Sequence, residues 1–347
     1  MPEPTFEAGL VKALQPVRFH ALAMAIYQLF ETGLYSHLDS SPARSVDAVA
    51  DDLRMDAWRL KTFVHYLRNE GYLALDPQGR VSLTNLAREL APYRPWYTMM
   101  IGGYTPTWMG MDKALQWGAP PAPRDLRQVG VGSCGISQHD AIPLTRRLMA
   151  HAPSPCTRLL DLGCGNGLYL VEFCLAMPEL EKAWGIEPSL GSCQAARQLI
   201  AQNGLEGRVE IIHGAAASAL KVESESLSPN FAVIGFVLHE ILGQEGRDGV
   251  IAFLRGLVDR FPGLNLIVIE VDGQLHNAQQ MGDGLGLAYY NPYCTLHPFT
   301  LQRLETPAFW DRLFKDAGLD VLSRLTTDPE VDSTGLELGY LLRRAAA

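Results

Sequence analysis

Three glycines and a carboxylate in the middle of the chain have the types and spacing to bind a nucleotide-like ligand. Gly163, Gly165 and Gly167 occupy alternate positions directly after the run 159–162, which is apolar except for Asp161. Apolar residues then recur at helical spacing, which predicts a buried strand, a tight turn and a helix. Glycine lets a backbone approach a ligand closely, and a helix N-terminus offers unpaired N–H groups and a positive dipole end. We therefore expect this turn to bind a nucleotide-like cofactor.

The spacing of these glycines separates two classes of cofactor. A dinucleotide-binding turn carries a glycine or alanine five positions after its first glycine, where close helix packing requires a small residue. This chain has Leu168 there, which argues against a pyrophosphate ligand. A second carboxylate, Glu187, ends the next predicted strand, 184–187. From the end of a strand it can accept hydrogen bonds from both hydroxyls of a ribose.

The order of strand, glycine turn, helix, strand and acid resembles motifs I and II of the class I S-adenosylmethionine-dependent methyltransferases. The resemblance implies that S-adenosylmethionine is the cofactor. It assigns cofactor binding to Asp161, Gly163, Gly165, Gly167 and Glu187. Most methyltransferases with these motifs have an Asp near position 215 that reaches the adenine amine. Ala215 stands there in this chain, which leaves adenine recognition to backbone groups or to other side chains.

A histidine and an acid follow the fourth predicted strand, 231–236, as His239 and Glu240. In the O-methyltransferases that this chain resembles, a His-Asp pair at the same place supplies the general base. An imidazole of near-neutral pKa can take the proton of a phenol or an acid as its oxygen attacks a methyl group. Glu240 could orient His239 in place of the Asp.

A second histidine, His297, lies in the long stretch between the fifth predicted strand and a helix that opens with Trp310 and Asp311. This spacing resembles the group of methyltransferases that act on the β-carbon of 2-oxo acids. In that group two histidines, one after strand four and one in the late loop, hold a metal ion that chelates the substrate. The resemblance implies that His239 and His297 bind iron or zinc. A hydrogen-bonded packing histidine is the alternative interpretation of His297.

The chemistry of carbon methylation explains why such a metal is useful. Carbon attacks a sulfonium methyl group only as an enolate, and the C3 proton of a 2-oxo acid is too weakly acidic to leave unaided. A cation bound to the carboxylate and the keto oxygen would stabilise the enolate charge and orient it. Asp272, Glu240 or Asp283 could serve as a further ligand, as its hydrogen-bond partner or as the base.

We therefore predict a C-methyltransferase that methylates C3 of a 2-oxo acid through a metal-chelated enolate. The resemblance favours 5-guanidino-2-oxopentanoate as substrate, whose guanidinium tail would need carboxylates in the pocket. One alternative is a metal-independent O-methyltransferase of a small phenolic or carboxylic natural product, with His239 as general base. A second is a non-catalytic winged-helix ligand sensor, which the intact cofactor motif disfavours.

Composition limits the partners of this protein. The chain has 347 residues, 47% of them hydrophobic, and a formal net charge of −9, so two domains with large cores are possible. Without a run of basic residues, a nucleic-acid partner is not expected. No apolar run has membrane-spanning length and the N-terminus lacks a signal-peptide core, so we expect a cytoplasmic protein. The six cysteines lack zinc-site spacing and are expected to be free thiols.

Strands and helices alternate along the range 141–347, which predicts a parallel sheet with helices on both faces. The fold class expected is α/β, a Rossmann-like doubly wound methyltransferase domain. Strands 320–325 and 336–342 near the end are expected to form its antiparallel closing hairpin. Cofactor and substrate then belong at the carboxyl ends of the parallel strands.

The range 1–92 is predicted to be a mainly helical winged-helix domain. Its candidate recognition helix, 57–70, carries a Trp, several large apolar residues and Glu70, which favours packing against protein over entry into a DNA groove. It resembles the dimerisation domain of small-molecule O-methyltransferases, so a homodimer is expected. The range 93–140, rich in Pro, Gly, Trp and Met, is predicted to be an irregular apolar connection that contributes to the substrate pocket.

Overall fold

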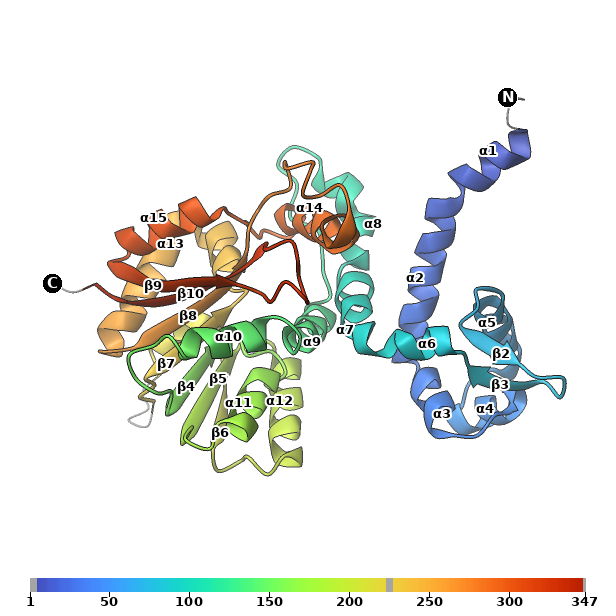
Figure 1. The fold of residues 1–347 in the computed structure, drawn as a ribbon, viewed down its shortest axis with the longest axis horizontal. Coiled ribbons are helices and arrows are strands. Elements are labelled where there is room, and N and C mark those ends of the chain that lie inside the picture. Colours follow the sequence, from blue (N-terminus) through green and yellow to red (C-terminus); the bar gives the residue numbers. More distant parts are fainter. Residues whose placement is uncertain (1–4, 223–226, 346–347) are drawn as a thin grey trace. The chain divides into compact units, whose positions relative to one another are not determined.

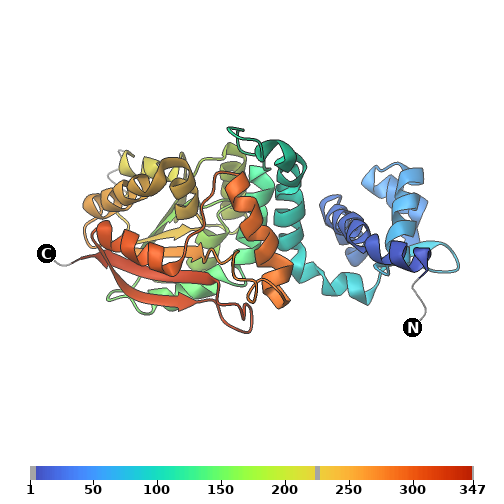
Figure 2. The ribbon, with the colours of Figure 1, turned by 90° about the horizontal axis from the view of Figure 1, so that it is seen from above.

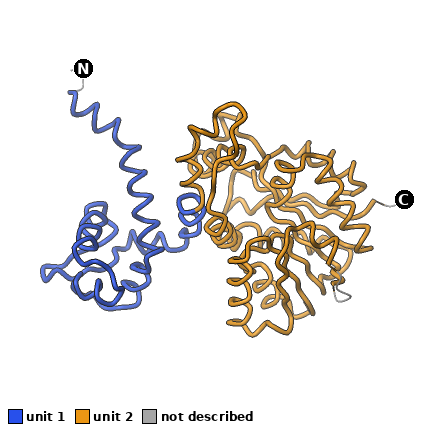
Figure 3. The backbone as a smooth tube through the Cα atoms, turned by 180° about the vertical axis from the view of Figure 1, so that it is seen from behind, with its two compact units in different colours: residues 1–102 blue, residues 103–347 orange. Residues whose placement is uncertain are grey.

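The computed structural model describes residues 5–222 and 227–345. The chain divides into two compact units, Met1–Gly102 and Gly103–Ala347 (Figure 3). We predicted boundaries at 92/93 and 140/141, and residues 1–4, 223–226 and 346–347 of those predicted ranges lie outside the described residues. Within the described ranges, every helix is too short or too polar to cross a bilayer.

Helices dominate the first unit, and a small sheet closes it. The helices are α1 (Phe6–Ala13), α2 (Gln15–Glu31), α3 (Leu34–Ser40), α4 (Val46–Leu53), α5 (Ala57–Asn69), α6 (Asn85–Glu89), η1 (Ala91–Tyr93), α7 (Arg94–Tyr97) and η2 (Thr98–Gly103). The described strands pair antiparallel in the order β1 (Arg44–Ser45), β3 (Arg80–Leu83), β2 (Leu73–Leu75). Several of these helices begin with a side-chain N-cap. At the start of α5, for example, the Asp56 carboxylate accepts the Arg59 N–H at 2.8 Å. Leu29, Val64 and Leu67 lie in the core of this unit.

A mostly parallel sheet forms the centre of the second unit. Its described strands are β4 (Arg158–Leu162), β5 (Lys182–Glu187), β6 (Val209–His213), β7 (Phe231–Gly235), β8 (Asn265–Val271), β9 (Leu319–Thr326) and β10 (Glu337–Arg344). Their order is β6-β5-β4-β7-β8-β10-β9, in which the first five are parallel and β10 runs antiparallel to both β8 and β9. The predicted α/β fold class and its closing hairpin are confirmed.

Helices cover both faces of this sheet (Figure 1). On one face lie α10 (Ala141–Met149), α11 (Leu168–Ala176) and α12 (Leu190–Gln202). On the other lie α13 (Leu238–Arg260) and α15 (Pro307–Asp316), which overlie the sheet in Figure 2. Side chains alternate between the two cores, so Leu159 packs with the first group while Leu160 and Leu162 pack with the second. Burial on both faces explains the continuous apolar runs that made these strands predictable.

Two segments expected to be irregular are helical, which corrects the prediction. The range 93–140 contains α8 (Thr105–Ala114) and α9 (Leu126–Ser137), and the stretch before His297 forms η4 (Gly286–Tyr290) and α14 (Asn291–Phe299). Their prolines and glycines suggested loops. Pro298 lies inside α14 near its end, and α9 tolerates its glycines between packed neighbours. Helix α13 begins at Leu238 and is kinked at Gly246.

Candidate active site

The glycine turn between β4 and α11 has the backbone geometry of a ligand-binding turn. The φ angles of Gly163, Gly165 and Gly167 are 84°, 53° and 78°, all in the left-handed region. A Cβ on Gly163 would lie 2.7 Å from Cγ2 of Val237, and one on Gly165 would lie 2.6 Å from Sγ of Cys134. The turn therefore requires glycine for its conformation and for the close approach of neighbouring segments.

Glu187, at the end of β5, is fixed against this turn. Its Oε2 accepts the Gly165 N–H at 3.0 Å, and its Oε1 accepts the Ser189 N–H at 2.8 Å. Burial raises the pKa of the carboxyl, although these two hydrogen bonds oppose the rise. The carboxylate is thus held at the carboxyl end of the strand, where each oxygen keeps a further lone pair for a ligand hydroxyl.

Asp161 is 4% exposed, and its Oδ2 has no hydrogen-bond partner within the described part of the chain. Burial, followed by the nearby Glu187, raises the pKa of this carboxyl to about 8. A buried carboxyl without a partner is costly, so the site favours a ligand with a donor or a positive charge. The structure brings the five residues predicted to bind the cofactor to one turn.

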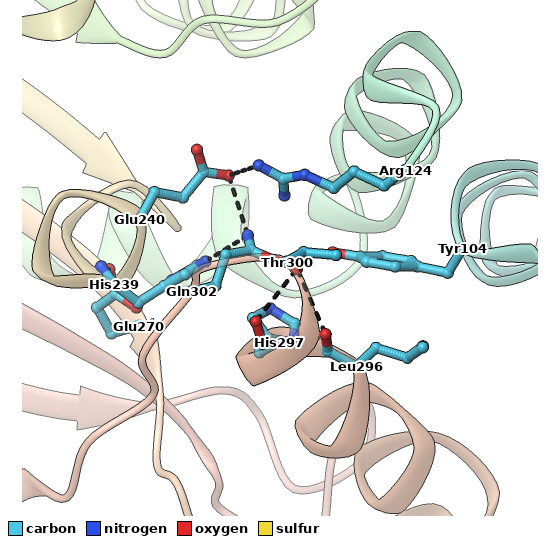
Figure 4. Close-up of polar contacts among 9 residues, drawn as sticks. All are labelled: Tyr104, Arg124, His239, Glu240, Glu270, Leu296, His297, Thr300 and Gln302. Carbon is cyan, nitrogen blue, oxygen red and sulfur yellow. Dashed lines mark hydrogen bonds and ion pairs between the residues drawn. The ribbon is translucent and has the colours of Figure 1, made fainter. Parts of the chain in front are cut away.

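His239 and His297 form the second part of the site, with ring centroids 5.1 Å apart and both side chains 1% exposed (Figure 4). The Nδ1–H of His239 donates to Oε2 of Glu270 at 2.7 Å, and the Nδ1–H of His297 donates to the carbonyl of Tyr293 at 2.7 Å. With both Nδ1 atoms occupied as donors, the lone pair of each neutral ring is on Nε2, and that of His239 accepts an N–H of Gln302 at 3.2 Å. Two basic rings therefore lie next to each other in a buried site.

The electrostatics of the two rings are opposite. Burial lowers the pKa of His239, but the charge and hydrogen bond of Glu270 outweigh it and leave the pKa raised. Burial, and then repulsion from His239, holds the pKa of His297 well below its usual range. His297 is therefore neutral at neutral pH, and the pair accepts an additional proton on His239 first.

Gln302 connects His239 to a charged pair. Its Nε2 donates to Nε2 of His239 at 3.2 Å and to Oε1 of Glu240 at 3.0 Å, while its Oε1 accepts the Thr300 hydroxyl at 2.7 Å. The Nη2 of Arg124 also donates to Oε1 of Glu240, at 3.0 Å (Figure 4). The Nη1 of Arg124 is buried without a partner among the residues described. This unsatisfied donor favours an anionic ligand group.

Aromatic rings line the same site from α14 and its neighbour η4. Tyr289, Tyr293 and His297 follow each other at four-residue spacing, with centroids 5.4 Å and then 4.0 Å apart. Tyr104 lies 6.2 Å from His297, and its hydroxyl contacts Oε1 of Gln302 at 3.4 Å. These rings exclude water from the histidine pair and strengthen the electrostatic interactions there.

Asp272 was predicted to be catalytic, and this role stays a prediction. It follows β8, is partly buried, and accepts both hydrogen bonds of the Gln274 amide at 3.0 and 3.1 Å. No hydrogen bond or ion pair in the described ranges joins it to His239 or His297. Glu270, inside β8, orients His239 instead, which also corrects the orienting role expected for Glu240. In the sequence, the one sign of this role was that Glu270 is a charged residue within a mainly apolar predicted strand.

The residues at this site fit the predicted metal ion only in part. The two Nε2 atoms suit iron or zinc, and both Nδ1–H groups bind the kind of partner that metal-bound histidines have. Groups of three or more His, Cys, Asp and Glu able to hold a metal ion are absent from the described residues. A metal here would thus have two imidazoles as its protein ligands from these residue types.

Comparisons with known proteins place the chain among methyltransferases. The chain is 43% identical over 342 residues to the 2-ketoarginine methyltransferase of Streptomyces arginensis, covering 98% of this chain and 97% of that protein. A mitomycin 7-O-methyltransferase structure matches with a TM-score of 0.68 and 17% identity over 98% of this chain and 99% of that one. Human N-acetylserotonin methyltransferase in complex with S-adenosylmethionine matches with a TM-score of 0.65 and 16% identity over the full length of both chains. No family model matches the sequence.

Proposed function

The chain belongs to the family of S-adenosylmethionine-dependent methyltransferases that includes the 2-ketoarginine methyltransferase, and from this premise we propose that it methylates C3 of a 2-oxo acid. The observation that carries the proposal is the pairing of His239 and His297, two buried rings with centroids 5.1 Å apart whose Nδ1 atoms are both hydrogen-bonded to acceptors. The name of the relative supports 5-guanidino-2-oxopentanoate, 2-ketoarginine, as the favoured substrate.

Arg124 is the residue proposed to bind the substrate carboxylate. Burial lowers its pKa, but Glu240 and Tyr104 outweigh that effect, so the guanidinium keeps its charge. Its buried Nη1 has no partner in the described ranges, and a carboxylate would accept that N–H. Because Glu240 anchors the Nη2 of the same guanidinium, the donor is already oriented before the substrate arrives.

His239 and His297 are proposed to hold a metal ion, iron or zinc, beside the keto group. Such an ion would supply Lewis-acid stabilisation of negative charge on the substrate oxygens. Glu270 and the Tyr293 carbonyl fix both rings through Nδ1, so the Nε2 atoms keep their positions. The low pKa of His297 keeps its nitrogen unprotonated and available.

Glu240 is proposed to accept the C3 proton. Its Oε1 accepts from Gln302 and Arg124, and its Oε2, which forms no hydrogen bond with the described residues, is proposed to act as the base. The C3–H electron pair then attacks the sulfonium methyl group, the carbon–sulfur bond breaks, and S-adenosylhomocysteine leaves. Asp161, the glycine turn and Glu187 are proposed to hold the cofactor for this transfer.

Methyl-labelled S-adenosylmethionine tests the proposal. The purified protein is incubated with a panel of 2-oxo acids and phenols, with and without chelator, and the products are located by NMR. We expect the label on C3 of a 2-oxo acid and a loss of turnover with chelator. Label on a phenolic oxygen, unaffected by chelator, would overturn the proposal in favour of an O-methyltransferase with His239 as base.

The first unit is proposed to pair with a second copy of the chain. Several large apolar side chains of α1, of α2 and of the residue between them are exposed within this unit, which soluble helices normally avoid. They are Phe6, Leu10, Val11, Leu14, Val17 and Phe19. A homodimer interface would remove this apolar surface from water.

A further inference from the structure

Three buried carboxyl groups lie in the second unit outside the histidine site. Asp140, Asp332 and Glu337 are 8%, 4% and 3% exposed. Asp140 immediately precedes α10, and Glu337 begins β10, where it pairs with Val271 at the carboxyl end of β8. The group therefore lies at the sheet edge where substrates of this fold bind.

These carboxyls have hydrogen-bond donors but no described cation. Glu337 accepts the Thr327 hydroxyl at 2.9 Å, and Asp332 accepts the Tyr290 hydroxyl at 2.6 Å. No lysine or arginine in ranges 5–222 and 227–345 forms an ion pair with any of the three. Burial raises the pKa of Asp140 to about 6, and burial together with Asp140 raises the pKa of Glu337 well above its usual range. Bound protons, in place of a counter-cation, thus neutralise the charge of Asp140 and Glu337.

Two unsatisfied hydroxyls belong to the same neighbourhood. Tyr169, on α11, is 7% exposed, and its hydroxyl has no hydrogen-bond partner in the described structure. Burial raises the pKa of this hydroxyl, the neighbouring Thr145 hydroxyl opposes the rise, and the charges of Glu337 and Asp140 add to it. Thr145, one turn along α10, is fully buried with its hydroxyl unpartnered among described atoms. Buried polar atoms without partners indicate a site for a ligand with several N–H groups.

Tyr289 links these acids to the histidine pair. Burial, followed by the charges of Asp140, Glu337 and then Tyr104, raises the pKa of its hydroxyl. Its ring also continues the aromatic series through Tyr293 to His297. A guanidinium group stacks favourably on such rings.

We propose that Asp140 and Glu337 bind the guanidinium end of the substrate, with Tyr169 and Tyr289 beside it, while the 2-oxo acid end lies at His239 and His297. A planar guanidinium presents five N–H donors, which matches carboxylates approaching from two sides. Binding would displace the shared protons and satisfy acids that are otherwise buried without a counter-charge. This inference rests on the proposed 2-oxo acid activity and deepens it.

The test compares two substrates in single variants. Asp140→Asn and Glu337→Gln are assayed with 5-guanidino-2-oxopentanoate and with 2-oxohexanoate, an uncharged acid of similar length. We expect kcat/KM for the guanidino acid to fall about 100-fold, the loss of one or two charge-assisted hydrogen bonds. For 2-oxohexanoate it should stay within about threefold of wild type, because the loss of a charge affects only the charged tail.

Glu330→Gln, an exposed acid between β9 and β10, is the matched control and should change neither substrate. Cofactor affinity and the thermal unfolding midpoint report whether each variant is folded. Equal losses for both substrates in folded variants would overturn the subsite, as would a wild type that methylates both acids equally well. A wild type that methylates neither acid, and a phenol instead, would overturn the proposed function itself.

Discussion

Glu270 holds His239 through two contacts, one to the backbone N–H at 3.1 Å and one to Nδ1 at 2.7 Å. Both side chains are almost fully buried. Because Glu270 lies within β8 and His239 in the first turn of α13, the carboxylate fixes the start of that helix and the ring on it at the same time. The tautomer of His239 is therefore set from inside the sheet.

Glu270→Gln should lower kcat about 10- to 100-fold, the usual cost of losing such an orienting partner. The neutral amide no longer raises the pKa of His239, so burial dominates and the pKa falls. The acid limb of the pH–rate profile should move to lower pH, while the Kd of S-adenosylmethionine stays unchanged. Asp248→Asn, an exposed acid on α13, serves as control. An unshifted profile would show that Glu270 is only a packing residue.

Asp161 should make cofactor binding depend on pH. Its pKa of about 8 in the free protein means that a proton must leave before a cationic cofactor meets a carboxylate. Affinity for S-adenosylmethionine should rise about tenfold per pH unit at most up to that pKa and then level off. Calorimetry in buffers of different ionisation enthalpy should detect the released proton, and Asp161→Asn should abolish its release.

The same carboxyl affects stability with the opposite slope. The folded chain keeps a proton that the unfolded chain, with the usual Asp pKa of 3.8, has already lost. Its contribution to the free energy of unfolding should therefore fall as pH rises from about 4 to about 8. A flat difference between wild type and Asp161→Asn across this range would contradict the raised pKa.

The parts of the site that follow regular strands were accessible from the sequence. The glycine turn follows a mainly apolar, buried strand, and Glu187 and His239 each come at or just after the end of another, so strand ends marked all three. The range 93–140 was harder, because Gly and Pro obscure the helical period of α8 and α9. Arg124 lies in the segment between these two helices, where hydrophobic periodicity gives no signal.

Contacts between distant segments account for the rest of what was missed. Gln302 follows α14 and reaches His239 and Glu240 because the segment after α14 packs on the first turns of α13, where the Arg303 N–H donates to the His239 carbonyl at 2.9 Å. Asp140 and Glu337 are almost 200 positions apart and meet where α10 packs on β10. No local pattern encodes such a meeting, since it depends on the order of strands in the sheet.

The histidine pair should determine the metal content of the protein. Wild type is expected to contain about one metal ion per chain by mass spectrometry, with each Nε2 at ~2.1 Å from the ion. His239→Ala and His297→Ala should each reduce this content by at least about tenfold, because either substitution leaves the ion with a single histidine ligand. His65→Ala, on an exposed face of α5, should leave it unchanged. Metal-free wild type with full, chelator-resistant turnover would contradict the proposed site.

The exposed apolar residues of α2 should control the association of two chains. Light scattering is expected to give twice the chain mass for wild type and the single-chain mass for Val17→Asp with Phe19→Asp, because charges would be buried at the interface. Val331→Asp, an exposed apolar residue of the second unit, should stay dimeric. A monomeric wild type at micromolar concentration would remove the basis for this pairing.

Glu240→Gln should separate proton removal from methyl transfer. In deuterated water without cofactor, the wild type is expected to exchange the C3 hydrogens of a bound 2-oxo acid, which NMR detects as loss of signal. The amide cannot accept that proton, so exchange and kcat should both fall about 10²- to 10⁴-fold. The amide oxygen can still accept from Arg124 and Gln302, so the KM of the 2-oxo acid should change little. Glu245→Gln, exposed on the same helix, should exchange normally. Undiminished exchange in Glu240→Gln would assign the base to another residue.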